Sequence, residues 1–143
     1  MLASTFTPGR LFVGRLSYDD DLSQAVERFC QESGIVAALF GAVGAVKRAA
    51  LGYYKQSEKA YVTLHLDEPL EIASCSGNIS LRDGKPFLHA HISFSDVSGQ
   101  TRSGHLMPGT KVFACEFTIQ EVLGPQLIRE YDELTGLWLW QKL

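Results

Sequence analysis

Hydrophobic and polar positions recur with two different periods along this chain of 143 residues. After the acidic cluster Asp19–Asp21, apolar residues recur every three or four positions over residues 22–30 and form one stripe, which predicts an amphipathic helix. Asp20 or Asp21 can accept hydrogen bonds from the free N–H groups of the first turn, and Gly34 is placed to end the helix.

The alternation typical of β-strands dominates the rest of the chain. Ile35–Val46 is apolar throughout, and its two glycines and leading Ile-Val favour a strand followed by a turn. Asp83-Gly84 supplies two positive-φ residues for a tight hairpin, and Asp96–Gln100 gives a second turn. The predicted strands are residues 10–16, 35–46, 49–54, 61–66, 70–81, 87–95 and 112–122, the last with Phe113, Cys115, Phe117 and Ile119 on one side.

One early helix and six or seven strands predict an α+β fold, in which a mainly antiparallel central sheet carries the helix on one face. No internal repeat and no linker interrupts the chain, so residues 1–143 are expected to form a single domain. The tail ends in four large apolar residues, Leu137–Trp140, which must be covered. We expect the tail to dock either on the chain's own sheet or on a neighbouring subunit.

Composition excludes several classes of protein. Apolar residues make up 45% of the chain and charged residues 20%, which excludes an intrinsically disordered protein. The net charge of −3 disfavours free-standing binding to nucleic acid. Neither a signal peptide nor an apolar run of about 18 residues occurs, so we expect a cytoplasmic location and no membrane contact. The cysteines are odd in number and far apart, which indicates buried thiols in a reducing compartment: Cys30, Cys75 and Cys115.

Three of the four histidines lie in one short stretch, at His89, His91 and His105. Residues two apart on a strand share a face, so His89 and His91 are expected side by side. If the following turn has an odd number of residues, as Asp96–Gln100 has, position 105 pairs opposite position 91 and shares that face. Three histidines with an open position are typical of a catalytic zinc, whereas a structural zinc takes four protein ligands. Asp96 is a candidate fourth ligand, or an acceptor for an imidazole N–H.

A structural interpretation of these histidines stays open, as polar residues on a solvated strand face or at a subunit interface. His65, alone on its strand, is expected to be a half-buried core histidine rather than a ligand. Cys75 lies inside a predicted strand and is interpreted as a core residue, not a nucleophile. Gly41-Ala-Val-Gly44 lacks the spacing and the following helix of a dinucleotide site.

Five segments, in their order along the chain, carry a resemblance to a known family. They are Gly9-Arg-Leu-Phe, the Ile35–Val46 segment running into Leu51-Gly-Tyr-Tyr, Pro69-Leu-Glu-Ile-Ala-Ser-Cys-Ser-Gly-Asn-Ile-Ser, Leu88-His-Ala-His and Ser103-Gly-His-Leu-Met-Pro-Gly-Thr. Together they resemble the PPC (plants and prokaryotes conserved) domain, formerly a domain of unknown function. The resemblance covers residues 8 to 138.

The resemblance implies an α+β domain that assembles as a homotrimer. In plant members the domain follows DNA-binding AT-hooks, whereas stand-alone prokaryotic members are often labelled DNA-binding. This chain has no AT-hook, so it resembles the stand-alone prokaryotic type. Prokaryotic members often carry three histidines that look like ligands for a metal, with zinc expected. Carried over to this sequence, the metal ligands are His89, His91 and His105.

Three hypotheses on function follow. The first, which we prefer, is a trimeric, non-enzymatic protein that binds zinc through the three histidines and has a regulatory or ligand-binding role, with a small anion completing the coordination. The second is a zinc-dependent hydrolase, in which Asp96 or Glu71 would act as general base. The third is a DNA-binding regulatory protein.

Overall fold

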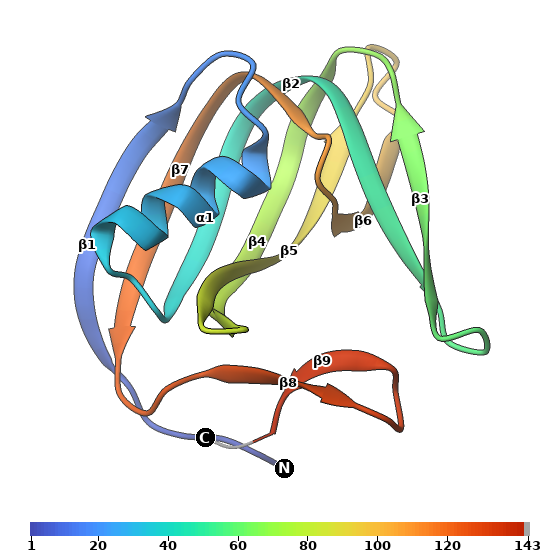
Figure 1. The fold of residues 1–143 in the computed structure, drawn as a ribbon. Helices are drawn as coiled ribbons and strands as arrows, with labels where there is room; N and C mark the ends of the chain where they lie inside the picture. Colours follow the sequence, from blue (N-terminus) through green and yellow to red (C-terminus); the bar gives the residue numbers. More distant parts are fainter. Residues whose placement is uncertain (142–143) are drawn as a thin grey trace.

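A computed structural model describes residues 1–141 as nine strands and one helix (Figure 1). All nine strands join one sheet. The α+β class with a helix on one face is confirmed, but six or seven strands were too few, because β6, β8 and β9 have only four to six residues and show little alternation. The elements are β1 (Thr7–Leu16), α1 (Leu22–Ser33), β2 (Ala38–Lys55), β3 (Ala60–Leu66), β4 (Leu70–Arg82), β5 (Lys85–Ser95), β6 (Thr101–Leu106), β7 (Lys111–Leu123), β8 (Ile128–Asp132) and β9 (Leu137–Trp140).

Strand β2 is the centre of the sheet. Its first half lies between β7 and β4, and its second half lies between β3 and β6. Because β4 also pairs with β5, and β5 with β6, the strands β2, β4, β5 and β6 form a closed circuit of pairings. Among the described strands, every pair is antiparallel except β4 with β8, so the sheet is mixed.

The turn expected after residues 35–46 does not exist, because β2 continues to Lys55 without interruption. Gly44 has a φ of 133°, and the register with β4 shifts between Gly41 and Gly44. A Cβ at position 44 would collide with the backbone carbonyl of Ala114 in β7. This glycine therefore marks a bulge and a close approach of two strands, rather than the end of one.

Helix α1 begins and ends where the sequence predicts. Asp21 is its N-cap and accepts a hydrogen bond from the backbone N–H of Gln24 at 3.3 Å, while Gly34 ends the helix with a φ of 68°. The Asp21 carboxylate also accepts from the backbone N–H of Gly109 at 2.6 Å, which attaches the start of the helix to the loop before β7. The helix lies on one face of the sheet (Figure 1), and three side chains of its apolar stripe are fully buried: Leu22, Val26 and Cys30.

One side chain of β7 points the opposite way from the prediction. Phe113 is 59% exposed, although it was expected on the side of the buried residues. The register between β2 and β7 passes from Ala114 to Val112 and skips Phe113, so a bulge reverses the alternation at this point. The other three residues of the predicted side are buried: Cys115, Phe117 and Ile119.

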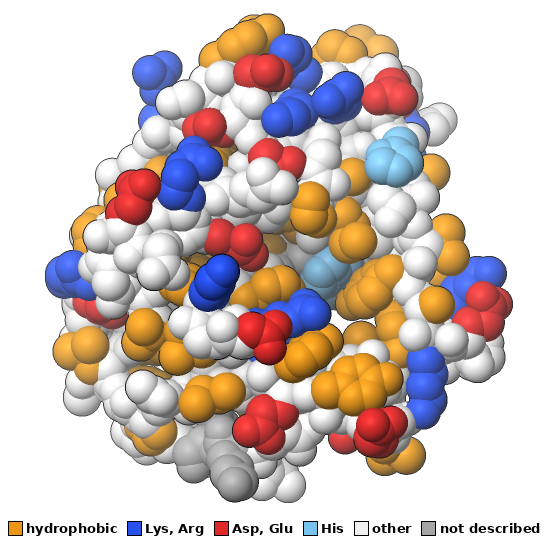
Figure 2. Space-filling model, viewed as in Figure 1, with side chains coloured by type: hydrophobic (Ala, Val, Ile, Leu, Met, Phe, Trp, Pro, Cys, Tyr) orange, Lys and Arg blue, Asp and Glu red, His pale blue; other side chains and the backbone are white. Residues whose placement is uncertain are grey.

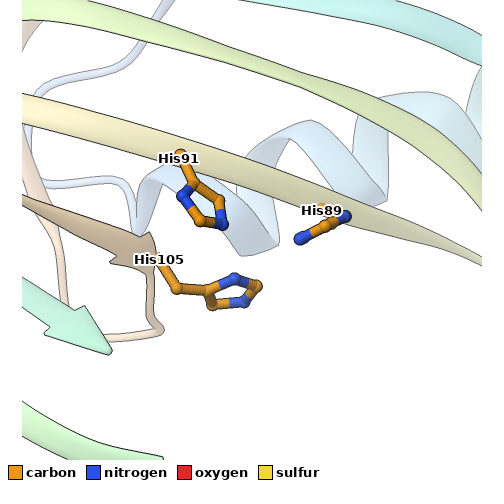
Figure 3. A group of neighbouring side chains, drawn as sticks. All are labelled: His89, His91 and His105. Carbon is orange, nitrogen blue, oxygen red and sulfur yellow. The ribbon is translucent and has the colours of Figure 1, made fainter. Parts of the chain in front are cut away.

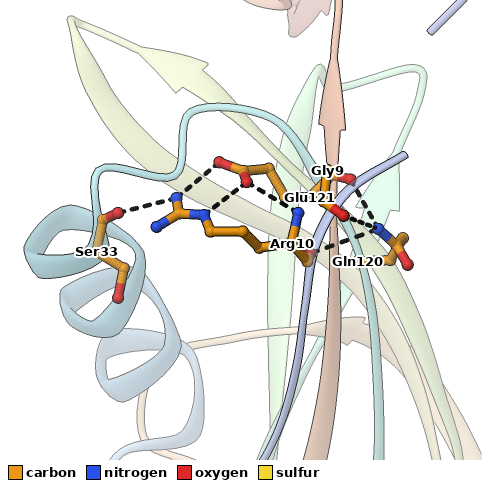
Figure 4. Close-up of polar contacts among 5 residues, drawn as sticks. All are labelled: Gly9, Arg10, Ser33, Gln120 and Glu121. Atoms are coloured by element: carbon orange, nitrogen blue, oxygen red, sulfur yellow. Dashed lines mark hydrogen bonds and ion pairs between the residues drawn. The ribbon is translucent and has the colours of Figure 1, made fainter. Parts of the chain in front are cut away.

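An ion pair joins β1, β7 and the end of α1 (Figure 4). The Arg10 guanidinium donates to both carboxylate oxygens of Glu121, at 2.7 and 2.8 Å, and to the carbonyl oxygen of Ser33 at 3.1 Å. Beside it, the Gln120 side-chain amide donates to the carbonyl of Gly9 at 3.2 Å. These contacts hold the first strand against the sheet and against the helix.

The C-terminal tail docks on the chain's own sheet, which is one of the two expected positions. Strand β8 pairs parallel to the end of β4, and β9 folds back on β8 (Figure 1). The pairing of β2 with β4 reaches only Ile79, so the edge of β4 at Leu81 and Arg82 is available for β8. The last strand thus lies over the same end of the sheet as the β4–β5 hairpin.

The three cysteines are buried and unpaired, as expected. Burial raises the pKa of Cys30 and Cys75 to about 12 and that of Cys115 to about 11. These thiols are therefore not nucleophiles at neutral pH. Within residues 1–141, no helix has both the length and the apolar character needed to cross a bilayer.

Candidate metal centre

The three histidines of the predicted cluster converge in space (Figure 3). His89 and His91 come from β5 and His105 comes from β6. The ring centroids lie 5.1 to 5.6 Å apart, and one ring nitrogen of each residue lies within 4.8 Å of the other two. Neither α1 nor the cysteines contribute to this group. It is the only group of this kind in the described residues.

Strand register explains the convergence. His91 pairs directly with His105 across the β5–β6 hairpin, as the odd length of the turn predicts. The neighbours of the histidines on β5, Leu88 and Ala90, are buried on the side of α1. Alternation therefore places His89 and His91 on the opposite face of the sheet.

Burial keeps two of the three imidazoles neutral. Desolvation, followed by the charge of Arg129 and of the neighbouring histidines, lowers the pKa of His89 to about 4. Desolvation likewise lowers the pKa of His105 to about 4. The His105 Nδ1 is buried and has no hydrogen-bond partner among residues 1–141. A neutral imidazole with an unused nitrogen has the chemistry of a metal ligand.

A buried arginine of the tail approaches this group. Arg129 of β8 is 7% exposed, and its Nη2 lies 3.2 Å from His89 Nδ1. A guanidinium only donates, so His89 Nδ1 accepts, and the neutral ring carries its proton on Nε2. Arg129 also donates to Ser80 Oγ at 2.8 Å, to Asn78 Oδ1 at 2.9 Å and to the carbonyl of Trp138 at 3.0 Å. Ligation of a metal by His89 therefore requires loss of the Arg129 contact or of the Nε2 proton.

A cavity of about 530 Å³ opens beside the histidines, and His89 and His105 form part of its wall. Figure 2 shows a hollow near the centre of the molecule, with a histidine inside it and charged and hydrophobic side chains around it. The β2–β3 hairpin and the β8–β9 hairpin meet at one side of this cavity. The Tyr54 hydroxyl donates to the carbonyl of Thr135 at 2.6 Å, and Lys59 Nζ donates to the carbonyl of Glu133 at 2.6 Å.

Asp96 does not accompany the histidines. Its carboxylate accepts from the backbone N–H of Ser98 at 2.8 Å and of Gln100 at 3.1 Å, and from the Ser98 hydroxyl at 2.6 Å. The Ser98 hydroxyl and these N–H groups lower the pKa of Asp96. Within the described residues, no hydrogen bond joins Asp96 to a histidine. Its role there is to shape the turn that sets the register of His105.

Other residues named from the sequence lie outside the group. His65 is exposed, not half-buried, because β3 pairs only with β2 and leaves that side chain uncovered. Glu71 is exposed near the start of β4, opposite Ser95. Cys75 is a core residue, as expected.

Two arginines and one glutamate that were not predicted from the sequence line the cavity: Arg82, Arg129 and Glu27. Arg82 and Arg129 come together because β8 pairs with β4, at the register Arg82 to Arg129. No local pattern indicates this parallel pairing of distant segments. Glu27 lies on the predicted helix, where a polar residue beside the apolar stripe gives no sign of a cavity.

Comparison with known proteins places the chain among relatives of known fold. The sequence model of the Plants and Prokaryotes Conserved (PCC) domain matches residues 3–123. A crystal structure of a metal-containing protein from Archaeoglobus fulgidus is 44% identical and covers 99% of this chain and 100% of its own, with a TM-score of 0.95. A plant- and prokaryote-conserved protein from Pyrococcus horikoshii is 34% identical and covers 100% of this chain and 99% of its own, with a TM-score of 0.94.

Two further relatives carry other names. A protein from Ralstonia eutropha described as a candidate DNA-binding protein is 27% identical and covers 89% of this chain and 88% of its own, with a TM-score of 0.80. The bifunctional protein GlmU of a Synechococcus strain is 32% identical over 131 residues. That match covers 90% of this chain but only 19% of the relative, so the chain spans about a fifth of that protein's length.

Proposed function

Because the chain belongs to the Plants and Prokaryotes Conserved domain family, we propose that this domain binds one zinc ion through His89, His91 and His105. One observation carries the proposal: three imidazoles from two paired strands converge, and the buried His105 Nδ1 has no other partner in the described residues. The metal-containing relative from Archaeoglobus fulgidus, 44% identical, supports it.

The donor set favours zinc. Imidazole nitrogens suit zinc among the available divalent metals, and three protein ligands leave one coordination position open. When bound, zinc supplies a Lewis acid that can hold water or a small anion at that position. The residues of the chain supply neutral nitrogens, and Arg129 beside His89 supplies a fixed positive charge that favours an anion in the open position.

A regulatory or ligand-binding role fits the surroundings better than hydrolysis. A zinc hydrolase needs a general base near the open position. Asp96 uses one carboxylate oxygen within the β5–β6 turn and the other with Arg102 of β6, and Glu71 is exposed on another part of the sheet. Glu27 lines the cavity, but its Oε1 accepts from the backbone N–H of Leu88 at 3.0 Å. Activity of zinc-loaded protein on ester, phosphoester or lactone substrates would contradict this preference.

The proposal includes a homotrimer, as expected from the family, and a location in the cytoplasm. Three unpaired, buried cysteines agree with a reducing compartment. Four exposed apolar side chains on β1 and β2 support an assembly, because they share one face of the sheet: Leu11, Val13, Leu39 and Val43. The register Leu39 to Asn78 to His89 places them on the same face as the histidines, so subunit boundaries would lie on that side of the sheet.

Metal content tests the proposal. We expect the purified, untagged protein to contain about one zinc per chain by mass spectrometry. The His89→Ala/His91→Ala double variant should lose it, whereas His65→Ala, which removes the exposed histidine of β3, should keep it. A metal-free wild-type protein that cannot be loaded with zinc would contradict the proposal. So would full zinc content in the double variant.

DNA binding is the second candidate, and the Ralstonia relative is the observation that favours it. The net charge of −3 opposes it. We expect no measurable binding of duplex DNA at about 150 mM salt, in a fluorescence anisotropy titration. Affinity that falls steeply as salt rises would instead show contacts with phosphates and would favour this second function.

A further inference from the structure

We propose that the cavity beside the histidines binds a small organic carboxylate with a flat apolar body, and that Arg82 holds its carboxylate group. This inference extends the proposed function, because the metal would lie at one wall of the same cavity. The contact with Arg82 itself requires no metal, so the two ideas can fail separately.

Arg82 carries the free charge of this cavity. Its guanidinium carbon lies 4.3 Å from the centroid of the Trp138 ring and 5.3 Å from that of Phe87. Its nearest acid is Asp83, at 3.8 Å and 71% exposed, which is too long for a charge-assisted hydrogen bond. No residue in the described part of the chain accepts a hydrogen bond from the Arg82 side chain. Stacking between aromatic rings fixes a guanidinium in place while its N–H edges stay available.

The other two cations of the cavity are already engaged. Arg129 donates from all three of its nitrogens, to Ser80, Asn78, Trp138 and His89. Lys59 donates to a backbone carbonyl of the neighbouring hairpin. Arg82 is therefore the cation whose donors a ligand can use in pairs, as a carboxylate does.

Charge in the cavity favours an anion. Three cationic side chains line it, and among the described residues Glu27 is the one acid that does. Burial raises the pKa of Glu27, which favours the neutral form of the one acid that lines the cavity. The Arg82 guanidinium, whose nearest acid is the exposed Asp83 at 3.8 Å, remains available in the described part of the cavity. This arrangement fits a ligand that brings the missing negative charge.

The remaining walls indicate an apolar, flat body. They consist mostly of aromatic and aliphatic side chains: Tyr54, Tyr61, Phe87, Leu88, Leu106, Met107, Leu137, Trp138 and Leu139. The volume of about 530 Å³ lies in the range of pockets for small organic ligands. Flat rings pack well against Tyr61 and Trp138, so an aromatic acid suits these walls better than a free inorganic anion.

The experiment compares benzoate with benzamide, which has the same shape but no charge. Both tryptophans of the chain, Trp138 and Trp140, lie in β9, so their fluorescence reports on the cavity without a label. We expect benzoate to bind about tenfold or more tightly than benzamide. We expect Arg82→Gln to abolish this preference and Arg82→Lys to retain part of it. Arg15→Gln, which removes an exposed arginine of β1, should leave it unchanged.

Each result decides the inference. Equal binding of the two compounds, no binding of benzoate at millimolar concentration, or an unchanged preference in Arg82→Gln would overturn it. The wild-type comparison alone suffices if Arg82→Gln fails to fold in a thermal unfolding control. A preference for benzoate that persists in zinc-free protein supports the Arg82 contact whether or not zinc binds. A preference for benzoate that is lost when zinc is removed would assign the anion to the metal. That result would overturn this inference and support the proposed function.

Discussion

Glu121 lies in β7, between β1 and β2, with only 11% of its side chain exposed, and Arg10 holds it in the charged form. Two hydrogen bonds from the guanidinium, together with one from the Arg10 backbone N–H, lower the pKa of Glu121 below its ordinary value of 4.5. A carboxylate with a lowered pKa in the folded state stabilises that state above its unfolded pKa. The stabilisation is lost as the pH falls through the folded pKa.

We therefore expect Glu121→Gln to lower the melting temperature at pH 7 by a few degrees. The difference from wild type should shrink as the pH falls through the lowered folded-state pKa of Glu121, because the stabilisation is lost once the carboxylate is protonated in both states. Thermal unfolding followed by circular dichroism across this range measures it. Glu116→Gln, which changes an exposed glutamate of the same strand, is the control. A difference that stays constant with pH would mean that packing, and not the charge of Glu121, carries the effect.

At the same scale, the histidine cluster shows what local rules can predict. His89 and His91 follow from alternation, and His105 follows from the odd length of the turn. The approach of Arg129 to His89 could not be predicted, since it depends on contacts between segments that are distant in sequence. The role of Asp96 as a ligand or as an acceptor for an imidazole stays a prediction. Its Oδ1 accepts from Ser98 within its own turn, a contact open to a carboxylate two residues before a serine.

At the scale of elements, Gly44 shows how β2 crosses the sheet as one strand. Its φ of 133° and the nearby backbone of β7 leave no room for a side chain. Gly34 also has a positive φ, of 68°, but a Cβ there would meet nothing within 4 Å. A side chain at Gly34 would therefore strain only the backbone. A side chain at Gly44 would both strain the backbone and collide with β7.

We expect Gly34→Ala to lower the free energy of unfolding by about 1 kcal/mol, as typical for a left-handed position. Gly44→Ala should lower it by more than about 3 kcal/mol, because β2 and β7 must separate as well. Urea unfolding of both variants provides the comparison. Similar values for the two would show that β7 can move away from Gly44 at little cost.

The predictions of strands failed where the strands are short, and where a glycine marks a bulge within a strand and not a turn at its end. The helix was predicted with both of its ends, since Asp21 and Gly34 are local signals. The break expected in β2 was wrong because a glycine pair can mark a bulge as well as a turn. Strands β8 and β9 were seen only as an apolar tail, because four or five residues show too little alternation to define a strand.

For the whole molecule, four exposed aliphatic side chains on one face of β1 and β2 are a feature that the single chain leaves unexplained. Val13 is 77% exposed and Leu11 61%, on the face of the sheet opposite α1. Leu39 and Val43 of β2, each 58% exposed, lie on the same face, with the polar side chains of Gln120, Thr118 and Glu116 of β7 between them and β1. Several large apolar side chains exposed on one face are typical of an interaction surface. The proposed homotrimer would cover it.

We expect light scattering to give a wild-type mass of about 47 kDa, three times the 15.8 kDa of the chain. Val13→Asp should reduce this mass toward that of one chain, because a carboxylate would be buried without a partner. Val97→Asp is the matched control, since Val97 is fully exposed in the turn between β5 and β6 and outside this surface. A wild-type mass of one chain would contradict the trimer. An unchanged mass in Val13→Asp would place the interface on another face, and the histidine face would then be free to bind a different partner.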